Sequence, residues 1–183
     1  MQAINNYQNN TNFTGGQFIV PKSCQKRFMR VLRNECDVSD LIRIRNTMEN
    51  GVGDKTRIYL EDLGYMAGQE VDGHLRGVIG KKEYFNSWPL FAPSSWSIPR
   101  FIEKLARKGD KAEIKLRKKG AHDIIEECRI ATAYKAQKSA QQAETKLECR
   151  RTKNYRDKGL VTEQEQKGYL LGEIYKLIGG KRK

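Results

Sequence analysis

The stretch "AHDIIEECRIATAYKAQKSAQQAETKLECRRTKNYRDK", residues 121–158, decides the fold class because it contains neither proline nor glycine. It is rich in Ala, Lys, Gln, Glu and Arg, which are good helix formers. It therefore predicts one long helix that ends before Gly159. At about 100° per residue, this helix carries two stripes. The alanine seam consists of Ala133, Ala136, Ala140, Ala143 and Leu147, and the basic ridge consists of Lys135, Lys138, Lys146, Arg150, Lys153 and Arg156.

The segment after Gly159 predicts a second helix that folds back on the first. Thr162 and Glu165 have the spacing of a capping box. The residues that follow form a wide apolar face of Leu170, Leu171, Ile174, Leu177 and Ile178. Because the connection is short, we expect an antiparallel helical hairpin. The apolar face would then pack on the alanine seam and leave the basic ridge in solvent.

The residues that precede the long helix also predict helix. Ser97 and Pro99 form a helix start, and Gly109 is expected to end that helix. The segment "DKAEIKLRKKG", residues 110–120, fits a helix capped by Asp110 and Glu113, but it also alternates as a strand would. Helical neighbours favour the helix. In either case this segment ends in a dense group of cations, namely Lys115, Arg117, Lys118 and Lys119.

Residues 87–99 predict a proline-stiffened strap rather than a helix. Pro89, Pro93 and Pro99 each restrict their own backbone and that of the preceding residue. Trp88 and Trp96 lie in the same segment, and their burial would anchor the strap between the two halves of the protein. The alternative is that both tryptophans stack on unpaired bases.

The N-terminal part predicts a smaller mixed unit. Residues 1–17 form an Asn-rich arm with little to bury. Residues 18–86 combine two short helices, around 24–33 and 38–48, with a hairpin of two strands about Gly80 and Lys81. Residues 55–68 fit either helix or strand. We therefore expect a mainly α protein with a small β element, an α+β fold, in which residues 100–183 form a basic helical domain.

The two short helices also allow a helix-turn-helix interpretation with the turn at Glu35. In that case the second helix would present Arg43, Arg45 and Asn46 to DNA. The alternative is an ordinary helical hairpin whose arginines are merely solvated.

The charge distribution indicates the class of function. The net charge is +13, and residues 100–158 contain 18 Lys and Arg against 9 Asp and Glu. Clustered cations bind polyanions because they release the counterions condensed on phosphates. The leading hypothesis is a non-enzymatic nucleic-acid-binding accessory protein of the replication, packaging or transcription type, with DNA or RNA left open. It would contact phosphates through the basic ridge and through Lys115, Arg117, Lys118 and Lys119. The alternative is a protein-interaction factor, such as an assembly factor or an inhibitor of a host enzyme, that docks its hairpin on an acidic protein surface.

Catalysis, cofactors and membranes receive little support from the sequence. The two histidines, His74 and His122, lie in different segments without a catalytic signature nearby. A nuclease interpretation would place Glu113 and Lys115 on a strand as an E-x-K pair, but the preceding acidic residue is missing. The four cysteines have no metal-ligand spacing, and no apolar run is long enough to span a bilayer. We expect a cytoplasmic protein with no cofactor, no metal, no membrane contact and an oligomeric state that the sequence leaves open.

Overall fold

The computed structural model describes residues 17–50, 56–66, 69–70, 73–86 and 97–179. Five helices account for most of these residues, so the expected mainly α protein with a small β element is confirmed. The helices are α1 (Lys22–Glu35), α2 (Val38–Glu49), α3 (Ile98–Lys119), α4 (Ile124–Asp157) and α5 (Glu163–Gly179). The predicted strap up to residue 96, with Trp88 and Trp96, and residues 1–16 of the predicted arm lie outside the described residues.

The β element is one four-stranded sheet in the order β1-β2-β5-β6 and a short two-stranded ribbon, β3-β4. The strands are β1 (Gln17–Ile19), β2 (Arg57–Asp62), β3 (Tyr65–Met66), β4 (Gln69–Glu70), β5 (Leu75–Ile79) and β6 (Lys82–Phe85). The hairpin predicted about Gly80 and Lys81 is β5-β6, and Gly80 has the positive φ of 61° that such turns favour. The ambiguous segment 55–68 contains strand β2, and β1 pairs with it in parallel at the edge of the sheet.

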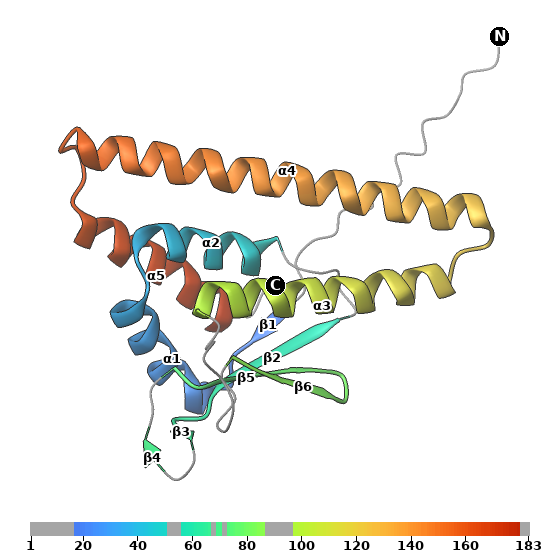
Figure 1. Cartoon of the computed structure of the whole chain (residues 1–183), viewed down its shortest axis with the longest axis horizontal. Coiled ribbons are helices and arrows are strands. Elements are labelled where there is room, and N and C mark those ends of the chain that lie inside the picture. Colours follow the sequence, from blue (N-terminus) through green and yellow to red (C-terminus); the bar gives the residue numbers. More distant parts are fainter. Residues whose placement is uncertain (1–16, 51–55, 67–68, 71–72, 87–96, 180–183) are drawn as a thin grey trace.

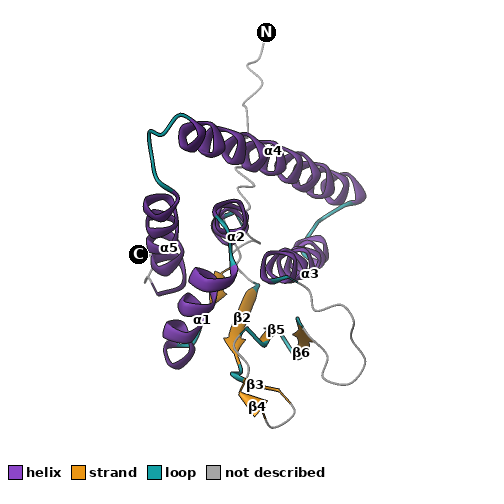
Figure 2. Cartoon of the chain, turned by 60° about the vertical axis from the view of Figure 1, so that its left-hand side comes forward, coloured by secondary structure: helices purple, strands orange, loops and turns teal. Residues whose placement is uncertain are grey.

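The elements stack in layers (Figures 1 and 2). The sheet forms the lowest layer, α2, α3 and α5 lie above it, and α4 crosses the top of the molecule. α2 is the central helix, because it contacts α3, α4 and α5. Asp37 caps α2 through a hydrogen bond of 2.7 Å from the backbone N–H of Asp40.

One hydrophobic core runs through residues from both predicted units. It joins Phe28 and Leu32 of α1 and Ile58 of β2 with Phe101 of α3 and Ile174 of α5. The contact between α3 and the sheet is particularly close at Gly77 of β5. A Cβ atom at that position would lie 2.4 Å from Leu105 Cδ1, so only glycine lets α3 approach the strand this closely.

The sequence prediction for α3 was wrong at Gly109. The helix passes through this glycine and continues to Lys119, so residues 110–119 are helical, as favoured, but belong to the preceding helix, and Gly120 is its C-cap. Gly109, Asp110 and Glu113 are all buried. Tertiary packing of this face outweighs the modest cost of one glycine inside a helix.

The predicted packing of the alanine seam was also wrong. The chain does reverse at Gly159, whose φ is 67°, and Thr162 and Glu165 form the predicted capping box. However, α5 packs its apolar face on α1 and α2 instead of on α4. Ala136, Ala140 and Ala143 are exposed, and Leu147 is 47% exposed. The bulky face of α5 finds more apolar surface to bury against α1 and α2 than a stripe of methyl groups would provide.

Candidate nucleic-acid interface

α4 is held to the rest of the molecule mainly by polar side chains. Within this helix, all of which the structure describes, Ile130 is the one buried residue. The face turned to α2 and α3 carries hydrogen-bonding residues at helical spacing, namely Tyr134, Gln141, Thr145, Glu148 and Thr152. This polar stripe fixes which sides of α4 remain exposed to solvent.

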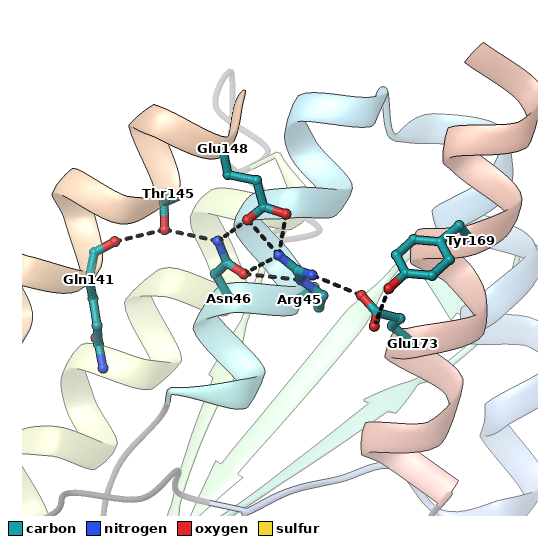
Figure 3. A network of polar contacts seen from close by, with 7 residues as sticks. All are labelled: Arg45, Asn46, Gln141, Thr145, Glu148, Tyr169 and Glu173. Atoms are coloured by element: carbon teal, nitrogen blue, oxygen red, sulfur yellow. Dashed lines mark hydrogen bonds and ion pairs between the residues drawn. The ribbon is translucent and has the colours of Figure 1, made fainter. Parts of the chain in front are cut away.

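The centre of this attachment is Arg45 of α2 (Figure 3). Its guanidinium donates to Glu173 of α5 over 2.8 Å and to both carboxylate oxygens of Glu148 of α4. Asn46 donates to Glu148 over 2.9 Å and to Thr145 over 3.1 Å. Arg45 therefore ties α2 to two other helices at once.

The electrostatics of this network match its geometry. Burial by itself would lower the pKa of Arg45, but the hydrogen bonds to Glu173 and Glu148 raise it above its ordinary value. Burial likewise works to raise the pKa of Glu173, yet hydrogen bonds from Arg45 and Tyr169 bring it below its ordinary value of 4.5. Each charged partner thus stabilises the ionised form of the other.

The helix-turn-helix candidates all have partners inside the protein. Arg45 and Asn46 belong to the network just described, and Arg43 donates to Glu103 of α3 over 2.9 Å and to Asp40 over 3.3 Å. In this conformation α2 lies between other helices, so it does not present these three side chains on a free face. The alternative of freely solvated arginines does not describe them either.

A second polar attachment joins α4 to α3. Asp110, which is 2% exposed, accepts hydrogen bonds from the hydroxyl of Tyr134 and from Lys138 Nζ, the latter over 3.1 Å. Burial raises the pKa of Tyr134 well above its ordinary value, and the hydrogen bond to Asp110 adds to the increase. This tyrosine therefore remains a neutral hydrogen-bond donor.

Glu113 is buried one turn further along α3. It accepts a hydrogen bond of 2.8 Å from Thr56 Oγ1 and one of 3.1 Å from Arg117 Nε. Because Glu113 and Lys115 lie on a helix, with Glu113 buried and Lys115 exposed, they do not form an E-x-K pair on a strand. The nuclease interpretation that required such a strand is thus wrong.

The basic ridge divides into paired and free cations. Lys138 is bound to Asp110, and Arg156 lies 3.7 Å from Glu163. The four other members are exposed and have no carboxylate partner within the described residues: Lys135, Lys146, Arg150 and Lys153. Arg150, Lys153 and Arg156 also line a cleft of about 200 Å³ against Val38, Ser39 and Ile42 of α2.

A second basic site, which we call the lysine cleft, lies between the end of α3 and the start of α4. Its volume is about 410 Å³. The lining residues are Lys111, Ile114, Lys115, Lys118, Lys119 and Glu127. Lys118 lies 3.5 Å from Glu127, whereas Lys111, Lys115 and Lys119 are exposed and have no ion pair within the described residues.

Lys111 was missed as a site residue in the sequence analysis. Lys111, Lys115 and Lys119 are spaced i, i+4, i+8 and so share one face of a continuous helix. This spacing is already present within the helix favoured for residues 110–120, so the sequence did contain the signal that identifies Lys111. Arg117, in contrast, was assigned to the interface but turns toward the buried Glu113.

Other reactive groups offer no comparable site. Burial and the neighbouring carboxylates of Asp40, Glu35 and Asp37 raise the pKa of Cys36 to about 12, which disfavours the nucleophilic thiolate. His74 is buried and stacked on Phe85. The described ranges contain no group of three or more potential metal ligands and no helix long and apolar enough to cross a membrane.

Comparisons with models of known protein families, with curated proteins and with solved structures give no match for this chain.

Proposed function

We propose that this protein is a non-enzymatic nucleic-acid-binding accessory protein that contacts phosphates through the basic ridge of α4. The observation that carries the proposal is the set of exposed ridge cations without a carboxylate partner in the described part of the chain, namely Lys135, Lys146, Arg150 and Lys153. Unpaired, solvated cations along one side of a rigid helix attract a phosphate backbone and release its counterions on binding.

The chemistry of the ridge favours contacts to phosphates over contacts to bases. Its side chains are lysines and arginines on the solvent side of the helix, and no aromatic ring lies among them for a base to stack on. Contacts of this kind position a protein on nucleic acid without reading its sequence. We therefore expect binding that depends strongly on salt and weakly on sequence.

The test compares two charge-reversal variants with the same change in net charge. The ridge variant is Lys146→Glu/Arg150→Glu/Lys153→Glu. The control variant is Arg129→Glu/Arg151→Glu/Lys158→Glu, whose exposed cations lie on a different side of α4, beside the alanine seam. Binding of labelled DNA and RNA is titrated at several salt concentrations, and circular dichroism checks that each variant is folded.

The ridge variant should lose affinity for every sequence, and its salt slope on duplex DNA should fall by about 0.9 for each phosphate that it no longer neutralises. The affinity of the control should fall much less. Equal decreases in both variants would mean that net charge alone drives binding and would contradict the assignment to the ridge. An absence of nucleic-acid binding by the wild-type protein would instead favour the acidic protein partner.

A further inference from the structure

We infer that the lysine cleft and the C-terminal end of the basic ridge, around Lys146, Arg150 and Lys153, form one binding surface for double-stranded nucleic acid. This surface spans about one helical turn of the duplex. This inference rests on the proposed function, because it specifies which nucleic acid the basic surface accepts. It adds Lys111, Lys115 and Lys119 to the interface.

The first supporting observation is that the lysine cleft lies beside the edge of the basic ridge that faces α3. Glu127 borders the lysine cleft and pairs with Lys118 of α3, and Lys138 of the ridge pairs with Asp110 of α3. Glu127 and Lys138 are 11 residues apart, so at 100° per residue their side chains leave the helix within about 20° of each other. By the same geometry, Lys135, Lys146 and Lys153 lie about 80–100° round the helix from Glu127, and Arg150 lies about 140° round. A ligand that meets both sites would therefore pass obliquely across this flank of α4, from its α3 edge to the exposed cations.

The second observation is the spacing. The lysine cleft lies at Glu127, and the exposed cations at the other end of the ridge centre on Arg150. The 23 residues between them correspond to roughly 35 Å at 1.5 Å per residue. One turn of duplex DNA is about 34–36 Å long, so the separation of the two cation groups along α4 is close to one turn of the duplex.

The third observation is that the stretch between the two groups carries no opposing charge on this flank. α4 has two carboxylates between Glu127 and Asp157, namely Glu144 and Glu148. Glu148 turns to Arg45, and Glu144 lies on the other flank of the helix. Lys135 lies between the two groups and is exposed.

The fourth observation is the rigidity of the spacing. α4 is one uninterrupted helix of 34 residues, and Asp110 and Arg45 fasten it to α3 and α2 at separate points. Fixed cations about one turn apart favour a ligand whose phosphates are equally fixed, which describes a stiff duplex better than a flexible single strand. Tyr155 of α4 is exposed but lies away from this flank, so it provides no stacking platform there.

The experiment measures how affinity depends on duplex length. The experiment uses three proteins: the wild type, the ridge variant Lys146→Glu/Arg150→Glu/Lys153→Glu and a cleft variant, Lys111→Glu/Lys115→Glu/Lys119→Glu. Each is titrated with a DNA duplex of about 8 base pairs, a duplex of about 20 base pairs and a single strand of about 20 nucleotides. The two duplexes are shorter and longer than one helical turn, which is about 10 base pairs. Lys81→Glu/Lys82→Glu, in the β5-β6 turn, changes residues outside both the lysine cleft and the basic ridge and serves as the control. A matching Lys→Gln cleft variant replaces the Glu variant if circular dichroism shows that the latter is misfolded.

The wild-type protein should bind the longer duplex at least tenfold more tightly per site than either the shorter duplex or the single strand. The cleft variant should lose this gain while still binding the shorter duplex, because the ridge remains intact. Equal affinity for both duplex lengths, a single strand bound as tightly as the longer duplex, or a cleft variant that behaves as the control would overturn the inference and leave the proposed function standing. If the wild-type protein bound no nucleic acid at all, both would fail.

Discussion

Arg45 shows how a single residue can connect elements that are distant in the sequence. Its partners Glu148 and Glu173 are 103 and 128 residues away. One of two interpretations of the sequence placed Arg45 on a DNA-reading helix, because its position on a short helix fits that role. Nothing local in the sequence identifies its carboxylate partners. In contrast, the capping box at Thr162 was predicted correctly, since its partner Glu165 lies only three residues away.

Replacing Arg45 should destabilise the protein. In Arg45→Met, Glu148 and Glu173 lose their shared cation, although their side chains keep partial access to water at 31% and 29% exposure. Because of this access, we expect a loss of about 2 kcal/mol in the free energy of unfolding, less than for a fully buried pair. Urea denaturation checks the value, with Arg151→Met on the exposed side of α4 as the control. A loss no larger than that of the control would contradict a structural role.

The same replacement should change how stability depends on pH. The pKa of Glu173 in the folded protein is below its ordinary value of 4.5, so its contribution is complete above that pH and is lost as the pH falls through the folded pKa. The stability of the wild-type protein should therefore decline below about pH 4.5, and this decline should be shallower in Arg45→Met.

At the scale of the element, α4 was located correctly but assigned the wrong packing face. Binary patterning selects the stripe with the most apolar residues, which in α4 is the alanine seam. The face that packs is polar, and its side chains are satisfied by Arg45, Asn46 and Asp110. Apolar periodicity cannot identify such a face, because its partners come from other helices. The basic ridge was recognised from the sequence because solvent-exposed cations need no partner from another helix. The ion pair between Lys138 and Asp110 could not be predicted in this way, because Asp110 belongs to α3.

Two substitutions in α4 distinguish the polar attachment from alanine packing. Ala140→Leu should change the free energy of unfolding by no more than about 0.5 kcal/mol, because Ala140 is exposed. Tyr134→Phe should cost about 1–3 kcal/mol, since it removes a hydrogen bond from the buried carboxylate of Asp110. Chemical denaturation of both variants provides the comparison. If the alanine seam were packed, the order would be reversed, with a cost for the added bulk of leucine and little effect of Tyr134→Phe.

At the scale of the whole molecule, the sequence predicted well where the charge and the secondary structure lie, but it predicted two separate units with a boundary at the strap. A change in composition marks the division, whereas the core that crosses it consists of ordinary apolar residues on both sides. Leu105 of α3 packs against Gly77 of β5, and Ile174 of α5 belongs to the same core as Phe28 of α1. The apolar face of each half identifies residues that need a partner, but it does not say which partner they have.

The shared core predicts that neither half of the chain folds alone. A fragment of residues 97–183 would expose Phe101, Leu105 and Ile174, which the intact protein buries against α1, α2 and the sheet. α4 is bound to its neighbours by polar contacts and has little apolar surface of its own to bury, so it cannot replace that core. We expect the fragment to show partial helicity without a cooperative thermal transition, while the full chain unfolds in a single transition whether it is followed by circular dichroism or by calorimetry.

Mixing fragments 1–96 and 97–183 should restore cooperative unfolding if the core alone holds the halves together. A cooperative melt of fragment 97–183 by itself would instead establish it as an independent domain.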